Sequence, residues 1–192
     1  NTIMNPDAFE AVKGAITQED NTIYESEDTE VVRDYAGLVN AINNAKTSSG
    51  TNYTINLENG TYECTGNSIS WGGSSSAKTL IINGNNQIID VKQKAGFITV
   101  QNGHTLILND LTISNSKQTN AGGAISLQTT STLNTNNVIF KDNTGRNGPA
   151  IWIQNGKAHL FNTTFTNNTA SVTGAAAWAG LGSILIEECN LD

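Results

Sequence analysis

The side chains that could carry catalysis in this 192-residue chain are a few scattered carboxylates and bases. Hydrolysis of a glycoside usually needs two carboxylates at a set separation, and an elimination reaction needs a base close to an acidic group. Only Asp142 lies near the candidate bases Lys141 and Arg146. From Cys64 onward, the repeated part of the chain otherwise offers these acids: Asp90, Asp110, Glu187, Glu188 and Asp192. No Asp-Asp pair occurs among them, so the sequence predicts no catalytic residues.

The histidines and cysteines of the chain predict neither a metal site nor a disulfide. His104 and His159 are isolated from each other and from any cysteine, whereas a zinc site needs clustered ligands. By alternation, the His159 side chain should point outward between Ala158 and Leu160. We therefore expect no metal ion and no cofactor. Cys64 and Cys189 fall about five repeats apart, or ~24 Å at the spacing of neighbouring strands. A disulfide needs Cα atoms within about 7 Å, so the sequence predicts two free thiols.

Two tryptophans occupy equivalent places in a repeat. Trp152 and Trp178 lie one repeat apart, and each stands between two small or apolar residues that alternation directs inward. Both indoles should then point outward, in a column that continues through Ser126. An exposed apolar strip usually marks a contact surface, and an indole offers a flat face and one N–H donor. The predicted ligand-binding residues are Trp152, Trp178 and Ser126.

These positions rest on a repeat of about 26 residues, a period typical of solenoids. Gly122–Leu127 returns as 148–153 and again as 174–179, and a second phrase recurs from 54, 80, 106, 133, 158 and 184. Apolar residues two apart indicate strands, and no copy is long enough to hold a crossover helix. The pattern predicts an all-β fold, a right-handed, single-stranded parallel β-helix of about six turns.

Each strand phrase ends at a polar corner. The corner column contains Gly84, Asp110, Asn137, Asn162 and Glu188. Glycine, asparagine and aspartate reach left-handed backbone angles most cheaply, so a different corner is expected at Glu188. Stacked asparagine side chains should hydrogen-bond between turns, as amide ladders do in other stacked strands.

The N-terminal part lacks the repeat. Residues 1–34 are acidic and are predicted to be a leader or linker, with a short helix beginning at Pro6. Asp34 suits the N-cap of a helix over 35–46 that would cover the first turn. The β-helix domain is then 35–192, with coils over 51–192. Since the chain ends inside its last repeat, we expect a C-terminal truncation of a longer protein.

Composition limits the partners. The formal net charge is −7 and only 14% of residues are charged, which argues against binding nucleic acid or an anionic membrane surface. No apolar run is long enough to span a bilayer, so no membrane insertion is expected. The domain is predicted to be a monomer. Four Asn-x-Ser/Thr sequons are glycosylation candidates: Asn52, Asn59, Asn162 and Asn167.

Two motifs resemble known surface proteins. Gly-Gly-Ala-Ile at 122–125, with Phe-x-x-Asn at 140–143 and 165–168, resembles the repeat of the polymorphic outer-membrane protein family of adhesins and autotransporters. A helix followed by Ile-Asn-Leu-x-Asn-Gly-Thr-Tyr at 55–62 resembles the adhesin-like surface proteins of methanogenic archaea. Both groups are built on the pectate-lyase-like (pectin lyase-like) β-helix. Ile113-x-x-Ser116 departs from the Phe-x-x-Asn pattern.

The resemblance implies an extracellular module of a larger cell-surface or cell-wall protein, touching glycans or proteins of other cells. The fold alone hosts unrelated functions. One alternative is a polysaccharide lyase or glycoside hydrolase of the same fold. The other is a structural stalk that spaces neighbouring domains and binds nothing.

Overall fold

A computed structural model describes residues 28–73 and 76–191 of the chain. Within these ranges the regular elements are one helix, α2 (Tyr35–Thr47), and strands. The strands are β1 (Asp28–Asp34), β2 (Asn52–Glu63), β3 (Ile69–Trp71), β4 (Thr79–Asp90), β5 (Ile98–Val100), β6 (Thr105–Ser114), β7 (Ile125–Leu127), β8 (Ser131–Lys141), β9 (Thr144–Asn147), β10 (Ile151–Phe161), β11 (Thr164–Thr166), β12 (Thr169–Thr173), β13 (Ala177–Glu187) and β14 (Asn190–Leu191).

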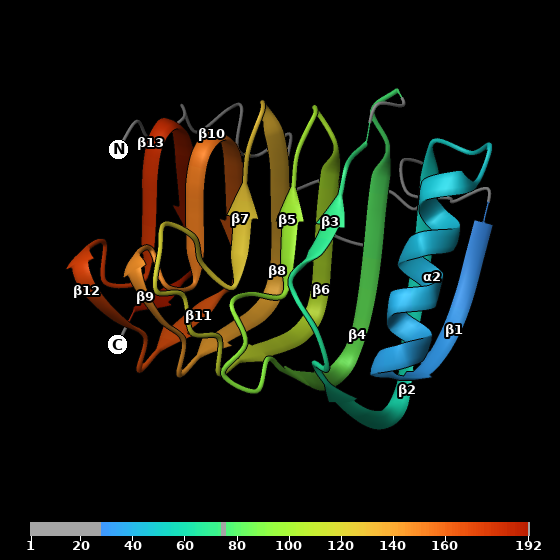
Figure 1. Ribbon diagram of the computed structural model, residues 1–192, viewed down its shortest axis with the longest axis horizontal. Helices are drawn as coiled ribbons and strands as arrows, with labels where there is room; N and C mark the ends of the chain where they lie inside the picture. The colour runs from blue at the N-terminus through green and yellow to red at the C-terminus, as the bar shows by residue number, and fades with distance from the viewer. Residues whose placement is uncertain (1–27, 74–75, 192) are drawn as a thin grey trace.

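The strands wind into a parallel β-solenoid of about six turns. Leu80 pairs with Leu106, and Leu106 with Leu133, so residues one repeat apart in sequence are neighbours in space. Every recorded strand pair is parallel, as the repeat predicts. Figure 1 shows the turns stacked side by side, from α2 and β1 at one end to β13 at the other.

Each turn presents three faces. The first face is formed by 52–57, 79–83, 105–109, 132–136, 157–161 and 183–187. The second face follows the corner and is formed by 62–63, 87–90, 111–114, 138–141, 164–166 and 190–191. The third face consists of β3, β5, β7 and the first residues of β10 and β13. In Figure 1 the short strands of the third face lie in front of the long strands of the first.

Alternation places one side-chain set of every strand in a continuous core. Leu80 and Ile82, and Leu106 and Leu108 one turn later, are fully buried. Phe140 and Phe165 stack between turns with ring centroids 5.3 Å apart. Burying each such side chain stabilises the fold by about 1.5–3 kcal/mol, so the core is held by contacts between turns.

The corner column behaves only partly as predicted. Asp110, Asn137 and Asn162 have left-handed φ angles of 52°, 54° and 46°. Glu188 has the same conformation, with φ 52°, so the expectation of a different corner there was wrong. Gly84 does not; in that turn Asn85 and Asn86 take the left-handed angles. The backbone geometry of the corner is thus imposed by stacking on the previous turn and overrides the preference of glutamate.

Two hydrogen-bonded ladders tie the turns together. Asn109 donates to Asn83, and Asn83 to Asn56, over 3.0 and 2.8 Å. A second ladder uses the Phe-x-x-Asn asparagines: Asn143 Nδ2 donates to Asn168 Oδ1 over 3.0 Å, and Asn143 Oδ1 accepts from the Ser116 backbone N–H over 3.0 Å. Ser116 can replace asparagine because its own backbone supplies the donor. The predicted hydrogen bonds between asparagine side chains of successive turns are confirmed.

The N-terminal end begins earlier than predicted. Residues 28–34, which the sequence assigned to the leader, form β1 and pair with β2, so this part of the assignment is corrected. The helix is present: Asp34 caps it by accepting the Gly37 N–H over 2.7 Å, and its buried residues join the core. The predicted leader segment 1–27, with its short helix at Pro6, lies outside the described residues.

Cys64 is buried, Cys189 is half-buried, and both are free thiols, as predicted. Burial raises the pKa of both thiols. Within 28–73 and 76–191, no helix has the length and hydropathy to cross a bilayer.

Candidate functional site

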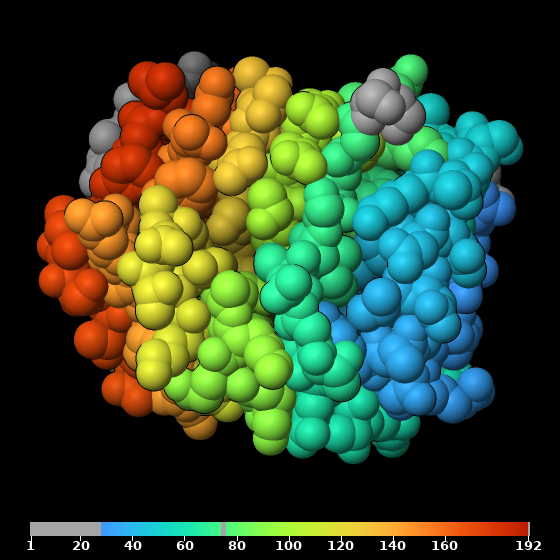
Figure 2. Space-filling model, in the orientation of Figure 1, coloured from blue at the N-terminus to red at the C-terminus, as the bar shows by residue number. Residues whose placement is uncertain are grey.

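The tryptophans stack in the predicted column. Trp152 is the register partner of Trp178 on one side and of Ser126 on the other. Their neighbours Ile151 and Ile153 belong to the core, so these three side chains point outward from the third face. The two indoles are nearly parallel, with an interplanar angle of 11° and ring centroids 5.9 Å apart. Figure 2 shows this side of the molecule as a closed surface of successive coils.

Exposure along this column differs from the prediction. Trp152 is only 8% exposed and Ser126 only 6%. The Ser126 hydroxyl accepts a hydrogen bond from the Gly123 N–H over 3.3 Å. The expected exposed strip is therefore corrected: two of its three members are buried, because Trp152 lies under Trp178 on one side and packs toward the Ser126 turn on the other.

Trp178 is the accessible member and is firmly seated. It is half-buried, and a Cβ added to Gly180 would come within 2.7 Å of the indole ring. Gly148 and Gly174 also lie close to this residue. A Cβ added to Gly148 would be 2.9 Å from the Trp178 Cβ, and a Cβ added to Gly174 would be 3.0 Å from it. Three glycines thus make room for this indole. Among the described residues β13 pairs only with β10, so no strand lies beyond the ring face opposite Trp152.

The candidate catalytic residues are not brought together. Asp110 accepts a hydrogen bond from Asn137 over 2.7 Å, and Asp142 accepts one from Asn167. Each of these two carboxylates therefore holds an asparagine of the next turn. Lys141 lies 3.9 Å from Asp142 in an exposed ion pair, which contributes little to stability. Arg146 is exposed on β9.

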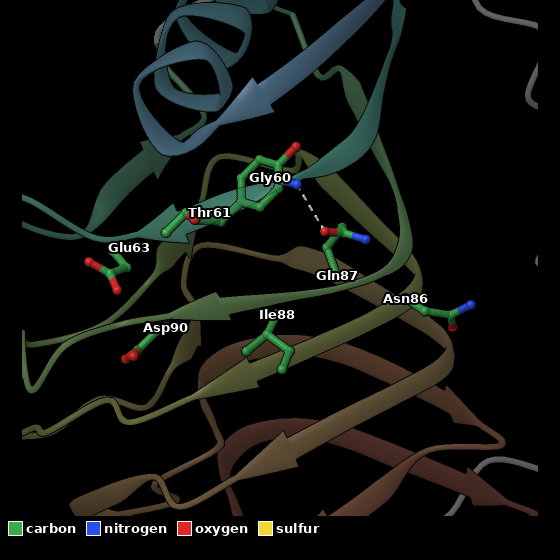
Figure 3. A pocket seen from close by; sticks show the side chains of 8 residues that line it. Gly60, Thr61, Glu63, Asn86, Gln87, Ile88 and Asp90 are labelled. Atoms are coloured by element: carbon green, nitrogen blue, oxygen red, sulfur yellow. Dashed lines mark hydrogen bonds between the residues drawn. The ribbon is translucent and has the colours of Figure 1, made fainter.

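A shallow depression on the second face was missed by the sequence reasoning. It has a volume of about 360 Å³ and is lined by residues 60–63 and 86–88 together with Asp90. Glu63 and Asp90 are register partners, and Figure 3 shows their carboxylates side by side at one end of the depression. Their spacing in the sequence, one repeat period, was the available signal.

Both carboxylates of this pair already have partners. Glu63 lies 3.7 Å from the Lys92 ammonium. Asp90 accepts the Lys92 backbone N–H over 2.8 Å and the Asn115 amide over 3.1 Å. These contacts give the two carboxylates a local structural role in holding the backbone and side chains at the end of the second face. Among the described residues no group of three or more His, Cys, Asp or Glu side chains is placed to hold a metal ion.

The two histidines are buried in separate places. His104 packs edge-on against Trp71, with ring centroids 5.2 Å apart, and its Nδ1 lies 3.1 Å from the Asn102 carbonyl oxygen. His159 points outward from the first face, as predicted, yet is only 4% exposed. Burial, reinforced by the positive charge of Lys157, lowers the pKa of His159 to about 4. This imidazole is therefore neutral at physiological pH.

The sequon asparagines differ in accessibility. Asn59, Asn162 and Asn167 are exposed, and Asn52 is half-buried in β2. The Asn59 amide oxygen accepts from Gln87 over 3.0 Å, and the Asn167 amide donates to Asp142. A glycan on Asn167 would be attached to the nitrogen that makes this contact and would leave it a single N–H, so modification and the hydrogen bond to Asp142 would share one group.

No family model, curated protein or solved structure matches this chain. Among the described tryptophans, Trp71 and Trp152 are buried and Trp178 is partly accessible.

Proposed function

We propose that this solenoid is an adhesin-like binding module of a larger extracellular, cell-surface or cell-wall protein, and that it contacts glycans through Trp178. The supporting observation is an indole fixed on its Trp152 side by stacking, with no described strand over its opposite face. Rigid aromatic anchors carry much of the binding energy at contact surfaces because little side-chain entropy is lost when they bind.

The chemistry of the indole favours a sugar. The apolar C–H face of a pyranose matches a flat aromatic ring in shape, and the ring's negative face attracts the C–H hydrogens. The side chains around Trp178 are small, so a ligand could approach the ring closely.

Binding of the 1–192 protein to a glycan and polysaccharide panel tests this proposal. Trp178→Ala should weaken binding by at least about tenfold, which is ~1.4 kcal/mol. Trp178→Phe should retain part of the affinity because a flat ring remains. Leu181→Ala is the matched control: it removes an exposed apolar side chain from the same strand and should leave sugar binding nearly intact. Equal losses in Trp178→Ala and Leu181→Ala would contradict an indole–sugar contact.

The second candidate function is polysaccharide cleavage, and the paired carboxylates Glu63 and Asp90 are what favour it. Side chains on neighbouring strands of one face lie about 5 Å apart, which is close to the separation of carboxylates in retaining glycosidases. The same panel should be assayed for released reducing sugar and unsaturated product. Product that disappears in both Glu63→Gln and Asp90→Asn would establish an enzyme and refute the non-catalytic proposal.

A stalk would give a third pattern. If wild-type protein binds no glycan and releases no product, the glycan proposal fails and a structural or protein-binding role replaces it. Light scattering of the same preparation checks the predicted monomer.

A further inference from the structure

A buried column runs along the outside of the first face. Its members are successive register partners in six strands: Thr54, Ile81, Ile107, Asn134, His159 and Leu185. We call this the outer column. The flanking residues in each strand, such as Leu106 and Leu108, belong to the interior core, whereas Ile81 and Ile107 do not. Side chains of the outer column therefore project away from the interior.

Side chains that project outward from a strand should be accessible to solvent, but all six side chains of the outer column are buried. Exposure along the outer column ranges from 1% at Ile107 to 8% at Thr54 and Asn134. The second face provides the comparison, since its outward residues Ile88 and Ile139 are 57% and 38% exposed. Both faces have the same strand geometry and spacing. Something that packs over the first face must account for the difference.

No described element supplies that cover. The helix α2 contacts β1 to β4 at the end of the solenoid, and its buried residues pack into the interior core. Among residues 28–73 and 76–191, the strands of the first face otherwise contact their ladder neighbours and the strands across the interior.

The centre of the outer column also lacks hydrogen-bond partners. Asn134 Oδ1 and His159 Nδ1 are buried and have no partner among the described residues. The two side chains are register partners, so they sit next to each other. Leaving a buried polar atom without a partner costs roughly 1–3 kcal/mol. The covering segment should therefore be apolar over Ile81, Ile107 and Leu185 and polar over Asn134 and His159.

We propose that the occupant of the outer column is the segment that precedes Asp28 in this same chain, residues 1–27. In β1, Thr29 is the register partner of Thr54, so the chain before Asp28 meets the sheet at the first rung of the outer column. From Thr54 to Leu185 the column is about 24 Å long, five steps of ~4.8 Å. The segment is long enough to cover that distance in either an extended or a helical conformation.

The composition of this segment fits the surface. Its larger apolar residues are Ile3, Met4, Phe9, Val12, Ile16 and Ile23, with polar and charged residues between most of them. Because the segment is tethered at Asp28, docking is intramolecular and benefits from a high effective concentration. The cover would make the first face an internal surface and leave the second and third faces for partners. This proposal does not depend on glycan binding.

The test compares wild-type and variant proteins of residues 1–192 by NMR titration of the His159 imidazole. Phe9→Asp/Ile16→Asp should undock the segment and raise the His159 pKa from about 4 toward the ordinary value near ~6.5. Thr17→Asp adds a charge to the same segment without removing an apolar side chain, and it should leave the pKa low. Light scattering accompanies each titration.

Three results would overturn the proposal. A His159 that titrates normally in wild-type protein would mean that nothing covers the outer column. A low pKa that persists in the double variant of a monomer would assign the cover to another part of the chain. A low pKa that persists in a dimer would assign it to a second copy. Hydrogen exchange of wild-type protein gives an independent check, because amides within 1–27 should exchange more slowly than those of a synthetic peptide of the same sequence.

Discussion

Asn143→Ala should be among the most destabilising single substitutions in this solenoid. The Asn143 side chain is fully buried. Its Oδ1 accepts from the Ser116 N–H over 3.0 Å, and its Nδ2 donates to the Ile113 carbonyl over 3.2 Å and to Asn168 Oδ1 over 3.0 Å. Alanine removes all three bonds and leaves the partners from two other turns without replacements.

The expected loss follows from those three bonds. Each contributes about 0.5–1.5 kcal/mol net, and a buried group left without a partner costs about 1–3 kcal/mol. We expect the free energy of unfolding to fall by ~3–5 kcal/mol, a large part of the ~5–15 kcal/mol typical of a domain. Such a loss lowers the Tm of a chain of this size by roughly 6–20 °C.

Urea unfolding followed by circular dichroism measures this change directly. Asn43→Ala is the control, because Asn43 lies exposed on α2 and alanine has the higher helix propensity. It should leave stability unchanged or slightly increased. An ordinary surface substitution changes stability by no more than about 0.5 kcal/mol. If Asn143→Ala stays within that range of the control at an equal m-value, the ladder does not hold the turns together and the reasoning fails.

Three further predictions concern other parts of the coil. Thr129→Gly should raise the urea midpoint, because a β-branched residue at φ 52° carries about 1–2 kcal/mol of backbone strain; an unchanged or lower midpoint would contradict this. Gly156→Ala should lower the Tm strongly, since its Cβ would overlap the Ser131 carbonyl oxygen; a normal Tm would refute that close approach. His159 stabilises the folded state fully above about pH 6.5 and less as the pH falls through its folded pKa of about 4, a loss of at most ~3 kcal/mol. His159→Gln should abolish that pH dependence, and urea midpoints between pH 4 and 7 would show whether it does.

The turns and their register were predictable from the sequence because a solenoid repeats its own geometry. Leu80, Leu106 and Leu133 occupy equivalent places in the repeat, and the structure pairs them directly. The corner conformation at Glu188 was not predictable from residue preference. The neighbouring turn fixes the path of the backbone there, and stacking of a whole strand outweighs the roughly 1–2 kcal/mol cost of one left-handed residue.

The alternation of apolar and polar residues could not predict which outward side chains are exposed to solvent. Periodicity states to which side of a strand a residue points, and it placed Trp152, Trp178 and His159 outward. Exposure depends on what lies over that side. Ile88 and Ile107 are both outward isoleucines on long strands, yet one is 57% exposed and the other 1%. The available signal was narrower than residue type. Isoleucine occupies two successive turns of the first face's outward column, at Ile81 and Ile107, whereas Thr112 separates the exposed outward residues Ile88 and Ile139 of the second face. Apolar residues on successive turns of one outward column should therefore be interpreted as evidence for a covering segment before they are assigned to a ligand.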